Sequence, residues 1–279
     1  MKKLSAIILL GACVLLSGCG QDQYAVERQY YWAQKQAGVI FNNPHATPPH
    51  ELQKSIDTFN QLIREYPKSN LAVDAQFIIA NLYIATEEYE KARLQLSKII
   101  KIYSKSQPIC AAAVFLQGNS YEAQNLWDSA LEQYKKVIED YPWTVKGIET
   151  PIYIAQHYKV KFQPDNMVEA YKEAIAHYTS LSREYPLSPV ALRLKILIVQ
   201  CYGELKDWKA VVNTFDNVLA EYKGRVQLDG ILLDLAMVYD RGLKDKVKAK
   251  ETLGKLIRDY PNSRVLPLAK SLLKQVSVK

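Results

Sequence analysis

The stretch YPKSNLAVDAQFIIANLYIATEEYEKARLQLSKIIKIY, residues 66–103, decides the fold of this chain. Its apolar residues recur at intervals of three and four over residues 72–85 and again over residues 89–103, which is the pattern of two amphipathic helices. The proline after Tyr66 ends the preceding helix, because it has no backbone N–H to donate and it restricts the residue before it. Ser69 is a residue type that caps the start of the next helix. We therefore expect a helix–turn–helix unit bounded by tyrosines.

Tyrosines that close such units recur along the chain at a nearly constant interval. They are Tyr66, Tyr103, Tyr141, Tyr185, Tyr222 and Tyr260, spaced 37, 38, 44, 37 and 38 residues apart. A fixed period in this range indicates stacked supersecondary units rather than one globular core. The longest interval holds about seven extra residues around 161–166, which we expect to form either a loop that binds a ligand or a simple longer turn.

Each unit also carries a small residue on the packed face of its second half. These residues are Ala92, Ala130, Ala174, Val211 and Ala249. Three residues before four of them stands an aromatic residue: Tyr89, Trp127, Tyr171 and Trp208. A small side chain at a contact allows two helices to approach closely, so the pattern predicts tightly packed helix pairs.

The small, aromatic and proline positions resemble those of the tetratricopeptide repeat, a helix–turn–helix unit of about 34 residues. The resemblance implies an all-α fold, a right-handed superhelical solenoid of tetratricopeptide-like helix pairs. We expect five repeats over residues 67–262, preceded by a degenerate N-terminal helix pair at 24–66 and followed by a C-terminal capping helix at 263–279. The proline-rich segment 42–49 separates the first two helices, and we expect it to be non-helical.

The N-terminus has the features of an export signal. A charged start, a short apolar run over residues 4–16 and the sequence Leu-Ser-Gly-Cys ending at Cys19 are typical of a secretory signal, and the run is too short to span a bilayer. The ending resembles the lipobox of bacterial lipoproteins. That resemblance implies a signal peptide at 1–18, a lipidated Cys19 and a tether at 19–23. Gly20 stands where this family carries an inner-membrane retention Asp, which implies an outer-membrane location facing the periplasm.

The charge distribution and the cysteines indicate which partners and metal sites the chain could have. The chain has a formal net charge of +7, and residues 241–279 hold eleven Lys or Arg against three Asp or Glu. This basic end suits an acidic partner or anionic lipid head groups, or is only a solvated helix face. Cys110 and Cys201 lie in apolar helical stretches without a CxxC or Cys–His cluster, so we expect two small buried residues and no zinc site. A disulfide between them stays open as the alternative.

No pattern of catalytic residues appears in the sequence. It contains no glycine-rich phosphate loop, no HExxH and no GxSxG motif, and the four histidines form no ligand pattern. The basic end lacks a nucleic-acid recognition motif. We therefore expect a protein that is not an enzyme and that uses no cofactor, metal, small-molecule substrate or nucleic acid.

The first helix of each unit carries the candidate binding residues, because in tetratricopeptide proteins these helices line a concave groove. Amides lie two residues before the tyrosine that closes each first helix: Asn81, Asn119, Gln156 and Gln200, with Met237 breaking the series. Apolar residues lie four residues before these: Phe77, Phe115, Ile152, Ile196 and Leu233. Charged residues fall near the same face: Asp74, Glu122, Lys159, Arg193 and Glu204. We expect the amides to pair with the backbone of an extended peptide and the apolar row to take its side chains. The alternative is that the amides only bridge neighbouring helices.

The combination of features also resembles a particular family of lipoproteins. The lipobox, the Tyr-Pro-x-Ser endings at 66–69, 185–188 and 260–263 and an insertion in a middle repeat resemble the BamD family of outer-membrane assembly lipoproteins. That resemblance implies a scaffold that binds a β-barrel assembly protein and extended barrel precursors. Two alternatives stay open: an accessory protein of cell-wall synthesis or division of the Tol-Pal-associated type, and a pilus or secretin assembly lipoprotein.

Overall fold

The structure, a computed structural model, describes residues 18–277. The predicted signal peptide lies outside the described residues except for Gly18, and the side chain of Cys19 is not described, so the signal peptide and the lipidation of Cys19 stay predictions. None of the helices in the described part is long and apolar enough to cross a membrane.

The described chain is all-helical, as predicted: residues 18–277 form thirteen α-helices and no strand. Contacts divide the chain into two compact units, Met1–Gly147 and Ile148–Lys279, and the division falls within the first turn of α7. The first unit contains α1 (Gly18–Asn42), α2 (Pro49–Glu65), α3 (Asn70–Ala85), α4 (Tyr89–Ile102), α5 (Gln107–Ala123) and α6 (Trp127–Asp140). The second unit contains most of α7 (Val145–Val160) and the six helices that follow it: α8 (Pro164–Glu184), α9 (Pro189–Glu204), α10 (Trp208–Glu221), α11 (Asp229–Met237), α12 (Lys246–Asp259) and α13 (Leu266–Ser277).

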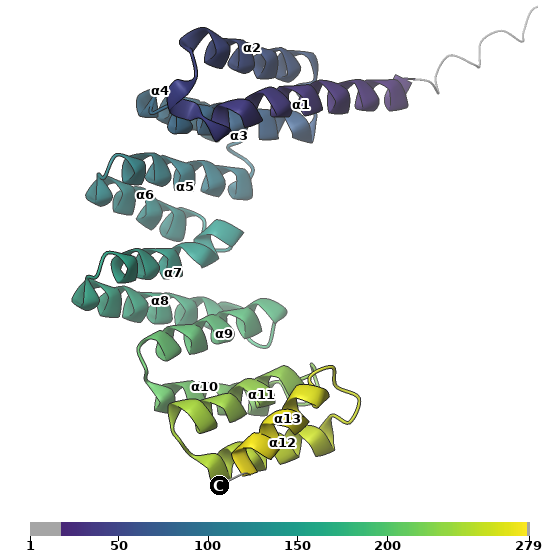
Figure 1. Cartoon of the computed structure of the whole chain (residues 1–279), viewed down its shortest axis with the longest axis vertical. Coiled ribbons are helices and arrows are strands. Elements are labelled where there is room, and N and C mark those ends of the chain that lie inside the picture. The colour runs from purple at the N-terminus through teal and green to yellow at the C-terminus, as the bar shows by residue number, and fades with distance from the viewer. Residues whose placement is uncertain (1–17, 278–279) are drawn as a thin grey trace, which may run out of the picture. The chain divides into compact units, whose positions relative to one another are not determined.

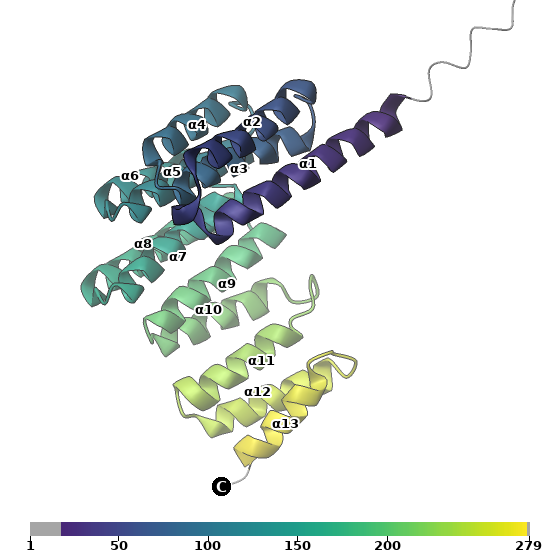
Figure 2. The same ribbon diagram turned by 45° about the horizontal axis from the view of Figure 1, so that its top comes forward.

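In the first unit, consecutive helices pack against one another as hairpins. Helix α3 packs on α4, α4 on α5 and α5 on α6, while α1 contacts both α2 and α3 (Figures 1 and 2). One apolar cluster joins α1, α2 and α3, and Phe59 and Leu62 of α2 are fully buried in it. The proline-rich segment before α2 was expected to be non-helical, but Pro44–Ala46 forms one 3-10 turn. A proline is well suited to the first position of a helical turn.

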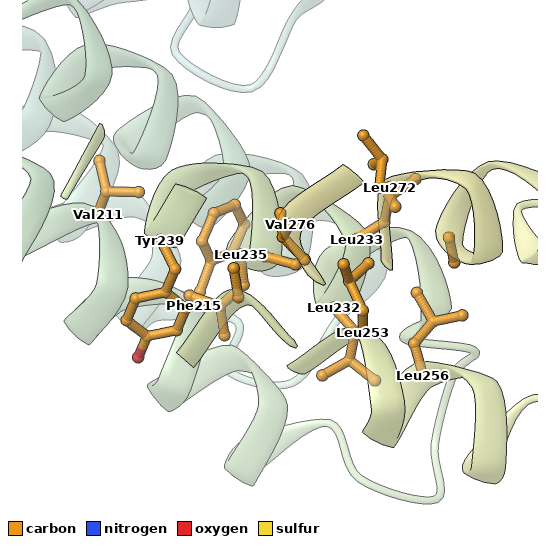
Figure 3. Close-up of a cluster of buried hydrophobic side chains, with 13 residues drawn as sticks. Val211, Phe215, Leu232, Leu233, Leu235, Tyr239, Leu253, Leu256, Leu272 and Val276 are labelled. Carbon is orange, nitrogen blue, oxygen red and sulfur yellow. The ribbon is translucent and has the colours of Figure 1, made fainter. Parts of the chain in front are cut away.

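The second unit is built in the same way. Contacts pair α8 with α9, α9 with α10, α11 with α12 and α12 with α13. One apolar cluster of this unit brings together Phe215 of α10, Leu232 of α11, Leu253 of α12 and Leu272 of α13 (Figure 3). The last helix, α13, therefore covers the apolar face that the final helix pair would otherwise expose.

The small residues of the repeat pattern lie at the closest contacts. Ala92, Ala130, Ala174, Val211 and Ala249 are all 0–1% exposed. Their burial is the expected consequence of placing a small side chain where two helices touch. The pattern read from the sequence therefore identifies core positions correctly.

The turns inside the helix pairs share one backbone geometry that the repeat pattern does not reveal. Left-handed residues lie two positions before the second helix of each pair: Glu87, Asn125, Phe162, Lys206 and Lys244, with φ between 55° and 63°. Glycine and asparagine are the usual residues in this conformation. Four of the five turns place another residue there, which shows that helix packing sets the turn geometry against local preference.

Ser69 caps α3 as predicted, and three further side chains cap α9, α10 and α12. The hydroxyl of Ser69 accepts a hydrogen bond from the backbone N–H of Leu71, and that of Ser188 accepts one from Ala191. Asp207 and Asp245 cap α10 and α12 through their side chains.

The extra residues of the longest repeat lengthen a helix rather than the turn, which corrects both expectations for residues 161–166: residues 161–163 form the turn, and residues 164–166 begin α8. Helix α8 is 21 residues long, whereas α4, α6, α10 and α12 are 14 residues long. The additional length is two helical turns at the N-terminus of α8, which begins at Pro164. Proline suits this position because its missing N–H would have no partner in the first turn.

Helix α11 departs from a regular first helix. It ends at Met237, the residue that breaks the amide series, and continues as the π-helical turn η2 (Val238–Gly242) that contains Tyr239. Gly242 lies against the indole of Trp208, where an added Cβ would lie 2.7 Å from a ring carbon. A π-turn inserts one residue without breaking the helix. Tyr239 in this turn is 9% exposed and belongs to the apolar cluster of the second unit.

Gly118 tests how tightly a helix pair is packed. An added Cβ would lie 2.4 Å from the ring of Tyr134. This ring is fully buried, so it could move away only by disturbing the side chains packed around it. We expect Gly118→Ala to lower the free energy of unfolding by about 1–3 kcal/mol in urea denaturation. Gly38→Ala is the matched control, because nothing lies within 4 Å of its Cβ and alanine favours a helix. Equal effects of the two substitutions would contradict the close approach of α5 and α6.

Candidate functional site

The predicted groove residues fall into two sets on first helices. Asp74, Phe77 and Asn81 lie on α3, and Phe115, Asn119 and Glu122 lie on α5, in the first unit. Ile152, Gln156 and Lys159 lie on α7, and Arg193, Ile196 and Gln200 lie on α9, in the second unit.

Much of the apolar row is buried. Phe115 and Ile152 are each 8% exposed, so the expectation that they form an open groove floor is wrong. The ring of Phe115 lies 5.1 Å from that of Tyr134, and the ammonium of Lys146 lies 4.5 Å from the centre of the Phe115 ring. These side chains pack helix against helix, and only Ile196, 37% exposed, offers substantial apolar surface.

On α5, the predicted amide serves the fold. The hydroxyl oxygen of Tyr134 lies 2.8 Å from Asn119 Oδ1 and 2.7 Å from Glu122 Oε2. Because Tyr134 is fully buried, its hydroxyl needs a protein partner, and these two acceptors from the facing helix supply it. At Asn119 the alternative interpretation, an amide that bridges helices, describes the contact.

On α3, the candidate residues are more accessible to solvent than Phe115 on α5. Asp74 is exposed, and Phe77 and Asn81 are half-buried. Burial raises the pKa of Tyr30 on α1, and the charge of Asp74 raises it further. Asp74 therefore lies beside α1, the helix that packs along α3.

The second unit presents the more open set. Lys159 Nζ lies 2.6 Å from Glu204 Oε2, an ion pair that ties the end of α7 to the end of α9. Gln156 stands one turn before Lys159, and Gln200 stands one turn before Glu204, so each amide lies on the same helix face as one member of the ion pair. Both amides are exposed.

Two charged and apolar side chains extend this surface along α9. Arg193 and Ile196 are exposed and precede Gln200 by seven and four residues, which places all three on one face of the helix. We call Gln156, Arg193, Ile196 and Gln200 the α7–α9 face. It offers two amides, one cation and one aliphatic side chain to solvent.

Burial shifts the pKa of two side chains in the second unit, Cys201 and His177. The Cys201 thiol is buried, and burial, with a smaller contribution from the charge of Glu204, raises its pKa to about 12. A thiol with such a pKa stays protonated and unreactive at neutral pH. Burial also lowers the pKa of His177, whose Nε2 has no hydrogen-bond partner.

Cys110 and Cys201 are free and buried, as the sequence predicts. The Sγ atom of Cys110 lies 3.3 Å from the carbonyl oxygen of Tyr103, a weak hydrogen bond. Over residues 18–277, no three His, Cys, Asp or Glu side chains come together in a way that would hold a metal ion.

Sequence reasoning missed the polar contacts between successive helix pairs. Arg93 of α4 donates a hydrogen bond at 2.7 Å to Oε1 of Gln124, the residue that follows α5, and its guanidinium lies 4.3 Å from the centre of the Tyr121 ring. On the same pair of helices, Gln117 donates to the hydroxyl of Ser97 at 2.9 Å. These residues follow no repeat pattern, so only the packed structure could reveal them.

The tetratricopeptide repeat family model matches this chain over residues 51–69, 74–106, 112–142 and 231–263. These segments contain most of α2, the pair α3 and α4, the pair α5 and α6, and the pair α11 and α12. The chain therefore contains tetratricopeptide repeats, a fold that typically serves protein–protein interaction. The pairs α7–α8 and α9–α10 lie outside the matched segments. A comparison with curated protein sequences finds no match.

Several solved structures resemble the fold at low sequence identity. The crystal structure of BtubC from P. vanneervenii is 16% identical, with 84% of this chain and 90% of that one covered and a TM-score of 0.41. YrrB, described as a TPR protein with an unusual peptide-binding site, is 17% identical over 76% of this chain and 97% of that one, with a TM-score of 0.37. A tetratricopeptide repeat protein from Parabacteroides merdae is 14% identical over 92% and 99%, with a TM-score of 0.35.

Removing the Tyr134 hydroxyl tests whether Asn119 and Glu122 are structural partners. We expect Tyr134→Phe to lower the free energy of unfolding by about 1 kcal/mol, because the buried hydrogen bond is lost while the ring keeps its packing. Tyr24→Phe is the control, since Tyr24 is 66% exposed. The free energy of unfolding of the Gln156→Ala/Gln200→Ala variant should differ from that of the original chain by no more than about 0.5 kcal/mol, because both side chains are exposed. A neutral Tyr134→Phe would return Asn119 to the set of binding candidates.

Proposed function

We propose that this chain is a lipid-anchored, non-catalytic scaffold of the bacterial envelope that binds extended segments of partner proteins. The observation that carries the proposal is the exposure of two amides, Gln156 and Gln200, each one turn before a member of the Lys159–Glu204 ion pair. The tetratricopeptide repeats support the binding role, and the lipobox ending at Cys19 supports the anchor and an outer-membrane location.

The α7–α9 face has suitable chemistry for an extended peptide. A glutamine side chain both donates and accepts hydrogen bonds, so it pairs with a peptide backbone whatever the sequence of the peptide. Ile196 adds an apolar contact, and Arg193 favours peptides that carry a carboxylate nearby. Such a face is selective for extended chain rather than for one sequence.

We infer that the partners belong to outer-membrane β-barrel assembly, on the resemblance to the BamD family. Unfolded barrel proteins are extended chains in which polar and apolar residues alternate, which matches a face of amides beside one aliphatic side chain. The lack of a heptad run in the sequence counts against the Tol-Pal-associated type, whose repeats also end in Tyr-Pro-x-Ser. The pilus or secretin assembly type shares the anchor and the repeats and stays the alternative.

An affinity capture from detergent-solubilised envelopes tests both parts of the proposal. The bait is the full chain, compared with Gln156→Ala/Gln200→Ala and with the control Asn213→Ala/Asn217→Ala, which removes two exposed amides from the second helix α10. We expect the full chain and the control to recover a β-barrel assembly protein and barrel precursors. We expect the glutamine variant to lose the precursors, because two backbone-pairing groups are gone.

Other outcomes would contradict the proposal at defined points. Recovery of cell-wall enzymes or Tol-Pal components without a barrel assembly protein would reject the assembly pathway. Equal recovery of precursors by the glutamine variant and the control would reject the α7–α9 face as their site.

A further inference from the structure

Helix α1 has apolar residues on two opposite sides. Its inner side, with Val26, Ala33, Ala37 and Ile40, is at most 5% exposed and packs against α2 and α3. The opposite side, about 180° away at 100° per residue, carries a second set. We call these residues the outer stripe: Tyr24, Arg28, Tyr31, Trp32, Lys35 and Val39. A helix that only covered a core would be polar on this side.

The outer stripe is open to solvent along the helix. Tyr24 and Val39 are each 66% exposed, Trp32 is 55% and Tyr31 is 53% exposed. Both views show the N-terminal half of α1 extending beyond α2 and α3 (Figures 1 and 2). The stripe is thus a continuous apolar and aromatic surface that no described residue covers.

The stripe combines aromatic rings with cations. The Lys35 ammonium lies 5.6 Å from the centre of the Tyr31 ring and 5.3 Å from that of Trp32, and Arg28 stands one turn before Trp32. No Asp or Glu belongs to the stripe. Tyrosine and tryptophan with an apolar body and a polar tip, beside Lys and Arg, are the side chains that favour the headgroup region of a bilayer.

We propose that the outer stripe lies in the headgroup region of a bilayer that contains anionic phospholipid, so that α1 rests along the membrane surface. This inference rests on the proposed lipid anchor, because Cys19 precedes the first stripe residue, Tyr24, by only five positions. The acyl anchor and the stripe together provide the two signals that stable attachment to a membrane requires.

The charge of the stripe argues against a second copy of the chain as its occupant. A twofold contact centred on the stripe would bring Arg28 of one copy towards Lys35 of the other, and the stripe has no carboxylate to neutralise them. Anionic headgroups supply that negative charge, at a gain of about fivefold in partitioning for each Lys or Arg.

Tryptophan quenching by brominated lipids tests the proposal on the full chain. The chain is reconstituted into vesicles of phosphatidylcholine, with or without phosphatidylglycerol, that carry bromine near the headgroup end of the acyl chains. We expect quenching that increases with the anionic lipid and is lost in Trp32→Phe but kept in Trp127→Phe. Arg28→Gln/Lys35→Gln should abolish the increase with anionic lipid, whereas the control Lys98→Gln/Lys101→Gln, which removes two exposed cations from α4, should keep it.

Three results would overturn the inference: quenching that persists in Trp32→Phe, quenching that is equal in neutral and anionic vesicles, or a dimer in which Trp32 is shielded from lipid. The mass of the intact chain reports the acyl groups on Cys19 separately. If the chain carries no acyl groups and Trp32 is still quenched, the proposed lipid anchor is rejected, and the outer stripe remains a membrane-binding surface.

Discussion

The close approach of paired helices at one small residue per pair is the constraint on which the rest of the structure depends. Ala92, Ala130 and Ala249 are fully buried at these contacts, and larger side chains would force the helices apart. Close helices leave no room to vary the connecting turn. This explains why residues as ill-suited as Phe162 and Lys206 adopt a left-handed backbone there. Packing thus determines local conformation, rather than the reverse.

The same packing decides which polar side chains remain available for binding. In the first unit, Asn119 and Glu122 satisfy the buried hydroxyl of Tyr134 and contribute to the fold. In the second unit, Gln156 and Gln200 have the same position in the repeat but stay exposed. At the place of Tyr134 the second unit has Tyr178, whose hydroxyl donates to the carbonyl oxygen of Ile148 at 2.7 Å, and Phe215, which has no hydroxyl. Identical places in a repeat pattern therefore have different roles, set by the residue on the neighbouring helix.

Periodicity was enough to predict the helices and the core but not the exceptions. Apolar spacing and the tyrosine period reflect burial, which repeats in every pair, so they identified core residues such as Ala92. The longer α8 and the π-turn after Met237 escaped prediction, since extra residues can enter a helix as easily as a loop. The burial of Phe115 also escaped it, because a helix face read from one sequence does not show what packs against it.

Site-specific photocrosslinking in intact cells tests the central claim most directly. A photoreactive amino acid replaces Gln156 on the exposed face of α7 or, as a reference, Asn213 on α10. The account predicts crosslinks to partner polypeptides in the membrane fraction from position 156 and none from position 213. Crosslinks from position 213 alone, or from neither position, would contradict a scaffold that binds its partners along its first helices.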